Sequence, residues 1–380
     1  MIPSPLLRLL LLVGGAVLLG ACASRSTPPP PVDPLAARIA AAAERLRQAP
    51  DDYDAVCDLG VLLYRSGDLP RAIPVLRRAH RLRITEPRAI AYLGLALRES
   101  GDDAAALATF AKYTQVTLKS PYFDWLKGSY RLMVHRTEQR ELIRRLSDFR
   151  PGTAPAVIPG RLASGPFVYY GDSEAYAGLD LALMFLVRDA VAATAPEADL
   201  VSPMELFVAA RAAHHRKLAI DPSARGIAAF FGASRLVRGG FNRSNDHQWV
   251  VDYAVWEAGG QAAAPVTRIV DEAGLVRLTE ELAGRLRGGE GGAAHLATRN
   301  WQAIVALGRG LAAEVAGDYS TAAHFHAQAL RHDRDLAVAE ERLEITRLFW
   351  LAGRDPDAAA GHPEPETGGG EPVSFNSLHR

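Results

Sequence analysis

The sequence lacks an excess of charge of either sign and contains almost no cysteine. Its 380 residues include 43 Lys and Arg and 43 Asp and Glu. This balance gives no basic excess of the kind that indicates nucleic-acid binding. The only cysteines are Cys22 and Cys57, so a dense disulfide framework is excluded and an apolar core must hold the fold together.

The apolar run near the start is too short to cross a bilayer. It extends from Leu9 to Leu19, whereas a membrane-spanning helix needs about 20 apolar residues. Arg8 precedes the run and small residues follow it, which is typical of an export signal that is later removed. We therefore expect residues 1–21 to be a signal peptide.

The end of this segment resembles the bacterial lipobox. The residues Leu19-Gly20-Ala21-Cys22 carry the resemblance. It implies that the Cys22 thiol receives a diacylglyceryl group and becomes the first mature residue, which tethers the protein to a membrane. Ala23 follows in place of Asp, and by the same resemblance this favours the outer membrane, with the protein facing the periplasm. The alternative is an ordinary signal peptide with a chance cysteine.

A proline run then predicts a linker. Residues 22–34 read CASRSTPPPPVDP and show no apolar periodicity. Proline-rich segments are extended and semi-rigid. We expect a stalk that holds the folded part off the membrane over about 40 Å at most.

Three glycines mark a sequence repeat. Gly94 lies 34 residues after Gly60, and Gly128 lies 34 residues after Gly94. A period of 34 is the signature of the tetratricopeptide repeat, in which each unit is a pair of antiparallel helices. Glycine at these positions lets the paired helices approach closely. The sequence therefore predicts a tetratricopeptide repeat domain at residues 35–150.

The ends of this domain are less regular. Residues 35–50 fit one leading helix. Residues 121–148 keep Gly128 but lose the small residues of the second helix, and end repeats are often atypical. We expect residues 121–148 to form a degenerate or capping unit.

Repeats of this family bind other chains along a concave face formed by the first helix of each unit. The resemblance implies that this face includes seven charged or tyrosine residues. They are Asp54, Asp58, Tyr64, Arg65, Tyr92, Arg98 and Glu99. The alternative is that these are ordinary solvated side chains of a repeat that only supports its neighbours.

A second helical block is predicted at residues 298–350. Gly317-Asp318-Tyr319 matches the turn between the two helices of a unit, so we expect one more unit and a following helix. The two blocks could pack together if the segment between them is an insertion. Residues 351–380 are rich in Pro, Gly and acidic residues and are expected to be a disordered tail.

Between the blocks, residues 152–288 show a mixed pattern of short strands and helices. The expected strands are 167–170, 199–201, 235–239, 249–255 and 266–270. The expected helices are 179–193, one opened by Ser202-Pro203, 223–232 and 275–286. The fold class is therefore predicted as α plus α/β, with helical repeats around a central mixed domain.

This order, and the segment from Gly232 to Phe241, resemble the family that includes the TolB amino-terminal domain, CsgG and LpoB. Members are mostly non-enzymatic envelope proteins that assemble or regulate other complexes. The long added hairpins with which CsgG forms a pore have no counterpart here, which argues against a pore.

The best enzymatic motif is Gly171-Asp172-Ser173, which follows an expected strand and resembles the nucleophile block of GDSL esterases. That family carries its base in an Asp-x-x-His, and none occurs after Ser173. His214 and His215, and His324 and His326, lack the spacing of three or four that metal pairs on helices prefer. We expect no catalytic residue, cofactor or metal, and no small-molecule ligand is evident.

The sequence favours a non-enzymatic, membrane-anchored scaffold or accessory that binds envelope proteins during assembly or secretion. An LpoB-like activator of a peptidoglycan synthase is the second hypothesis, although the stalk is short for it. A hydrolase built on Ser173 is the third.

Overall fold

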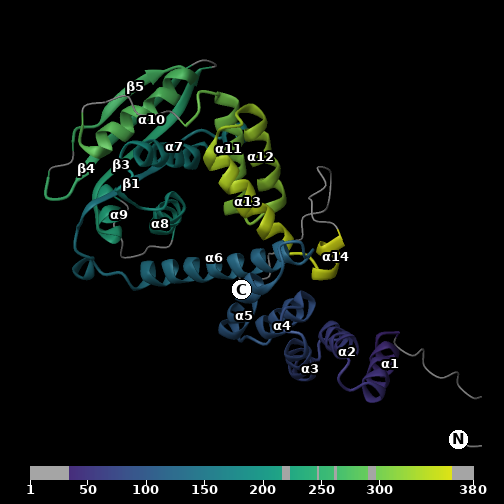
Figure 1. Ribbon diagram of the computed structural model, residues 1–380. Coiled ribbons are helices and arrows are strands. Elements are labelled where there is room, and N and C mark those ends of the chain that lie inside the picture. Colours follow the sequence, from purple (N-terminus) through teal and green to yellow (C-terminus); the bar gives the residue numbers. More distant parts are fainter. Residues whose placement is uncertain (1–33, 216–222, 246–247, 261–262, 290–296, 362–380) are drawn as a thin grey trace, which may run out of the picture.

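The computed structural model describes residues 34–215, 223–245, 248–260, 263–289 and 297–361. Figure 1 shows a row of helices at the amino-terminal end, a sheet with its own helices, and a second helical block that lies beside both. Within the described residues, no helix is long and apolar enough to cross a membrane. The predicted signal peptide and most of the predicted linker lie outside these residues.

The first block is a chain of helix pairs behind a leading helix. Its elements are α1 (Pro34–Gln48), α2 (Tyr53–Arg65), α3 (Leu69–Leu82), α4 (Pro87–Glu99), α5 (Asp103–Phe110), the 3₁₀-helix η1 (Ala111–Gln115) and α6 (Phe123–Asp148).

The turns inside the pairs repeat one design. Gly67 and Gly101 adopt positive φ angles of 77° and 85°, a conformation that side chains other than glycine resist. The next residue then caps the second helix, because the carboxylates of Asp68 and Asp102 accept backbone N–H groups of the first turn. The two turns therefore share one backbone geometry and one type of helix cap.

The second block contains α11 (Trp301–Val315), α12 (Tyr319–His332) and α13 (Ala337–Ala352), followed by the short helix α14 (Pro356–Gly361). Gly317, with φ 79°, and Asp318, which caps α12, repeat the same turn. The expected helix pair and following helix are thus present.

The glycines with the 34-residue period explain how the two blocks meet. A Cβ on Gly60 would lie 2.7 Å from Leu76 in the paired helix α3, and one on Gly94 would lie 2.3 Å from Phe110 in α5. A Cβ on Gly128 would lie 2.2 Å from the carbonyl oxygen of Leu348, which belongs to α13. The third glycine therefore faces a helix of the second block.

This packing corrects the prediction for residues 121–148. The expected degenerate or capping unit has no second helix of its own, because residues 123–148 form one 26-residue helix, α6, and α13 of the second block packs against it. Lys127 adds an ion pair of 2.8 Å to Glu344 of α13. The helical framework is continuous in space although residues 149–297 separate its two parts in the sequence.

The inserted segment forms a five-stranded sheet with helices. Its elements are β1 (Ile158–Tyr169), α7 (Leu179–Thr194), β2 (Asp199–Leu200), α8 (Pro203–His215), α9 (Ala224–Phe231), β3 (Ala233–Asn245), β4 (Gln248–Glu257), β5 (Val266–Val270) and α10 (Glu272–Arg287), with 3₁₀-turns η2 (Pro151–Thr153) and η3 (Glu174–Tyr176). The expected order of strands and helices is confirmed.

The strand order is β2-β1-β3-β4-β5. Strand β1 is parallel to both of its neighbours, β2 and β3. Strand β4 is antiparallel to both of its neighbours, β3 and β5. Helix α7 is buried along most of its length between this sheet and α11, which agrees with its apolar sequence. At the start of α7, a Cβ on Gly178 would lie 2.1 Å from the carbonyl oxygen of Gly308 in α11. The sheet is therefore packed directly against the second helical block.

The expected disordered tail at 351–380 needs correction at its start. Helix α13 continues to Ala352, and α14 follows with Pro356 and Ala359 buried. Ala359 has an exposed fraction of only 2% because α14 packs against the first helical block. Residues 362–380 lie outside the described part of the chain.

Candidate functional site

Most of the predicted binding residues lie together on one face of the first block, formed by α2, α4 and the start of α6. We call this surface the repeat face. The Tyr64 hydroxyl donates a hydrogen bond to the Glu99 carboxylate, and Arg65 Nη2 donates to the Tyr92 hydroxyl at 2.8 Å. The rings of Tyr64 and Tyr92 meet edge to face with centroids 5.6 Å apart. Tyr92 itself is fully buried.

Asp58 belongs to the same surface through a residue that the sequence analysis missed. Arg88 Nη1 donates to Asp58 Oδ1 at 2.7 Å, and Arg45 Nη2 approaches Asp58 Oδ2 at 3.3 Å. Arg88 stands 34 residues after Asp54, so the repeat period alone could have placed it on this face. Tyr122 stands 34 residues after Arg88 and was missed in the same way.

The other two predicted residues are peripheral. Asp54 is exposed at the start of α2, and Arg98 is half-buried near the end of α4. Among the described contacts, neither side chain hydrogen-bonds to α14. The predicted set is thus divided into a connected group on the repeat face and two residues at its margin.

The repeat face is occupied by the chain's own α14. Asp355 lies within 3.2 Å of Arg65 Nη2 and receives the Tyr92 hydroxyl at 3.3 Å. Asp357 receives Arg88 at two points, Nε to Oδ1 and Nη2 to Oδ2, both at 3.1 Å. It also accepts the Tyr122 hydroxyl at 2.7 Å. We call Arg65, Arg88, Tyr92 and Tyr122 the arginine–tyrosine cluster.

Backbone and apolar contacts complete the docking of α14. Trp125 Nε1 donates to the carbonyl oxygen of Arg354 at 3.0 Å. Pro356 and Ala359 are buried, and Ala359 packs with the apolar core of the first block. Side-chain exposure is 28% for Asp357 and 32% for Arg88, so solvent screens these pairs and each contributes about 1 kcal/mol. Several such contacts together hold the segment.

The cluster keeps its charges in the state that binding requires. Burial alone would raise the pKa of Asp357, but hydrogen bonds from Arg88 and Tyr122 outweigh it and hold that pKa below its ordinary value. Burial, with the charge of Asp357 as the next cause, raises the pKa of Tyr92. At neutral pH Asp357 is therefore an ionised acceptor and Tyr92 is a neutral donor.

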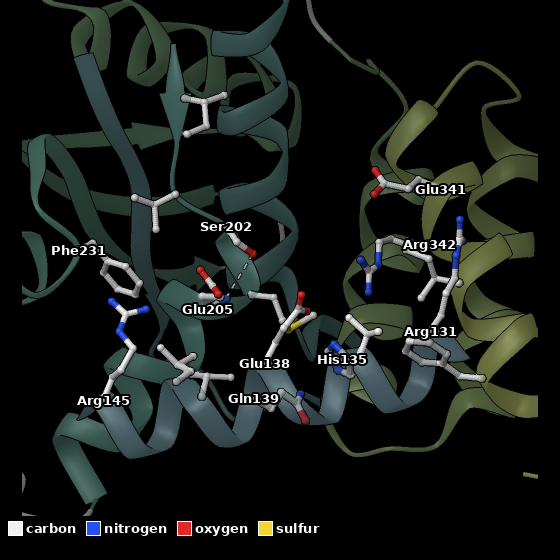
Figure 2. Close-up of a pocket in the computed structure, with 18 of the residues that line it drawn as sticks. Arg131, His135, Glu138, Gln139, Arg145, Ser202, Glu205, Phe231, Glu341 and Arg342 are labelled. Atoms are coloured by element: carbon white, nitrogen blue, oxygen red, sulfur yellow. Dashed lines mark hydrogen bonds between the residues drawn. The ribbon is translucent and has the colours of Figure 1, made fainter. Parts of the chain in front are cut away.

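A second feature is a cavity of about 830 Å³ between α6, α8, α13 and the ends of β1 and β2. Figure 2 shows Arg131 and His135 on its α6 wall, Arg342 on α13, and Glu205 on α8. Its lining carries charges of both signs, and several are paired across the fold. Examples are Arg161 with Asp199 at 2.7 Å and Arg131 with Glu344 at 3.3 Å. This lining does not select a ligand of either charge.

Burial governs the titration of the cavity's histidine. The ring of His135 packs against that of Phe349 at a tilt of 35°, with centroids 5.4 Å apart. Its pKa falls to about 4 because burial, and then the nearby charges of Arg342 and Arg136, disfavour the protonated ring. His135 is therefore neutral at physiological pH.

The serine of the esterase-like motif lies outside both features. Ser173 is exposed and precedes the short helix η3. The backbone N–H of Tyr176 in η3 donates to the carbonyl oxygen of Ser173 at 3.1 Å. Cys57 is buried in α2. No group of three or more His, Cys, Asp or Glu that could hold a metal ion occurs within the described residues.

No protein-family model matches this chain, and no curated protein sequence matches it. Among solved structures, it is similar to a tetratricopeptide repeat protein from Parabacteroides merdae ATCC 43184, at 12% identity and a TM-score of 0.25. The similarity covers 82% of this chain and 92% of that one. A TM-score of this size carries no argument, so the description of the helical repeats depends on their own period, turns and packing.

Proposed function

We propose that this protein is a non-catalytic scaffold that binds other proteins of the bacterial envelope through its repeat face. The observation that carries the proposal is the arginine–tyrosine cluster. It holds the two carboxylates of a short segment, Asp355 and Asp357, with side chains from α2, from α4 and from the residue that precedes α6. Charge-assisted hydrogen bonds of this kind give a peptide both affinity and register.

We further propose that a lipid on Cys22 anchors the protein to the outer membrane, facing the periplasm. The lipobox-like residues Leu19-Gly20-Ala21-Cys22 support this proposal. The first helix begins at Pro34, so the proline-rich linker separates the lipid from the folded part. The repeat face would then lie close to the membrane surface, where assembly and secretion complexes are found.

The inserted sheet domain supports a role in the envelope. Its element order is the one expected for the family of the TolB amino-terminal domain, CsgG and LpoB. We propose that it belongs with this group and contributes a second contact surface. The alternative from the same resemblance is an activator of a peptidoglycan synthase, and the short stalk makes it the second choice. A hydrolase that uses Ser173 is the third.

The proposal is tested by chemical cross-linking in intact cells, followed by capture of the protein and mass spectrometry of its neighbours. The informative variant is Arg65→Gln/Arg88→Gln, because both side chains are partly exposed and their loss leaves no large cavity. The matched control is Arg77→Gln/Arg81→Gln, which removes two exposed arginines from α3.

We expect at least one envelope protein to be captured by the wild type and the control but not by the repeat-face variant. The same neighbours in all three would overturn the proposal that the repeat face is the docking surface. Hydrolysis of a chromogenic ester that disappears in Ser173→Ala would instead favour the hydrolase.

A further inference from the structure

The short helix α14 contacts the repeat face as a bound peptide would. Asp355 and Asp357 are two positions apart and both point their carboxylates at the arginine–tyrosine cluster. The indole of Trp125 holds a backbone carbonyl of the same segment. We propose, on the basis of the proposed function, that the repeat face recognises a partner segment with two such carboxylates, and that α14 is an internal copy of this ligand that must leave before the partner binds.

The segment is preorganised for this role. Asp355 accepts the backbone N–H groups of Asp357 at 2.9 Å and Ala358 at 3.2 Å, and so caps the helix that it begins. Pro356 occupies the first helical position, where its fixed φ angle favours the helix. A ligand whose bound shape is set locally loses less entropy on binding. The recognised element is therefore an Asp-Pro-Asp turn that opens a short helix.

Helix α14 can leave while α13 keeps its place in the fold. It has six residues, which is too short for a helix to be stable in isolation. Its link to α13 passes through Gly353, which is exposed. By contrast, Leu348, Phe349 and Leu351 anchor α13 in the buried core. The exchange is therefore confined to the residues after Gly353.

The charge of the vacated face selects an acidic ligand. Without α14, Arg88 keeps its ion pair with Asp58, and Glu99 keeps the hydrogen bond from Tyr64. Arg45 lies beside the Asp58 carboxylate at 3.3 Å. Since the three arginines on this face, Arg45, Arg65 and Arg88, outnumber these two carboxylates, an anionic segment is favoured over a basic one.

The test is a binding titration of the full-length protein with a fluorescein-labelled peptide of residues 350–361, followed by fluorescence anisotropy. The wild type should bind weakly, because α14 is tethered beside its own site and competes at high effective concentration. The variant Asp355→Asn/Asp357→Asn should release α14 and bind the peptide at least tenfold more tightly. The matched control Asp335→Asn/Glu340→Gln removes two exposed carboxylates from the second helical block and should resemble the wild type.

A second variant releases α14 by a different cause. Ala359→Lys places a charged side chain at a buried position while it keeps both aspartates, and it should also bind the peptide more tightly than the wild type. Adding Arg65→Gln/Arg88→Gln to either variant should abolish binding, and a peptide with Asn at both acidic positions should not bind. Circular dichroism of each variant verifies that the helical fold is retained.

Equal affinity of the wild type and both release variants, or no binding by any of them, would overturn the inference. These results differ from failure of the proposed function. If the peptide does not bind but cross-linked neighbours still depend on Arg65 and Arg88, the scaffold stands and the internal-ligand inference fails. If the peptide binds as expected but no cross-linked neighbour depends on those arginines, the internal-ligand inference stands and the proposed scaffold function fails.

Discussion

Arg88 and Asp357 form a two-point contact across 269 positions of the chain, with Nε to Oδ1 and Nη2 to Oδ2 both at 3.1 Å. The planar guanidinium matches the carboxylate, so the contact fixes direction as well as distance. It joins the fourth helix to the last described one. Several expectations about docking of α14 depend on it.

Replacing Arg88 with lysine should loosen α14 without removing the positive charge. A lysine ammonium group cannot reproduce the two-point contact, so we expect docking to weaken by about 1 kcal/mol. The measurement is native-state hydrogen exchange of the α14 amides, which should become about fivefold faster. Arg81→Lys on the exposed side of α3 is the control. Unchanged exchange in Arg88→Lys would mean that apolar contacts alone hold the helix.

Docking of α14 should be lost in acid. The pKa of Asp357 is lower in the docked state than the ordinary carboxylate value of about 4. The stabilisation is therefore fully present above that ordinary value and disappears as the pH falls through the lower folded-state pKa. Hydrogen exchange or NMR of α14 between pH 6 and about pH 2 follows it. Asp357→Asn should show a flatter profile in this range, and an identical profile would exclude Asp357 as the titrating group.

Gly128→Ala should separate the two helical blocks. The new Cβ would lie 2.2 Å from the Leu348 carbonyl oxygen, which is backbone and cannot move aside as a side chain would. We expect a loss of about 1–3 kcal/mol in the free energy of unfolding, measured by chemical denaturation. Gly152→Ala, where nothing lies within 4 Å of the added atom, is the control. Equal stability of the two variants would contradict the packing of α6 on α13.

Glu314→Gln should destabilise the second block strongly. Glu314 is 2% exposed and accepts Arg342 Nε at 3.0 Å, while Arg342 is 12% exposed. Removing one partner leaves a buried charge uncompensated, which costs about 3–5 kcal/mol. Thermal unfolding compares it with Glu341→Gln, an exposed position on α13. A small effect would show that water reaches Arg342 in the variant.

Cys22→Ala should detach the protein from the membrane if the lipid is its anchor. Loss of the thiol removes the attachment site, and stable anchoring needs more than one acyl chain. Membrane and soluble fractions of cells are compared by immunoblot, with Cys57→Ala as the control because Cys57 is buried in α2. Continued membrane association of Cys22→Ala would point to a protein partner as the anchor.

The seven predicted binding residues illustrate what local pattern can provide. The period placed Tyr64, Arg65, Tyr92 and Glu99 on one face, and they are joined there by hydrogen bonds. Applied one step further, the same period includes Arg88 and Tyr122. The period does not predict a role for Asp355 and Asp357, because they lie outside the repeats, in an acidic, glycine-rich segment that is typical of a disordered tail.

By itself the sequence determined the elements of this protein. The 34-residue glycine spacing, the Gly-Asp turns and the alternation of β4 are local signals, because backbone geometry and capping depend on residues a few positions apart. Only the tertiary structure decided that Gly128 faces Leu348 and that α14 covers the repeat face. Those contacts join residues more than two hundred positions apart, and close packing and charge pairing across such distances leave no periodic trace in the chain.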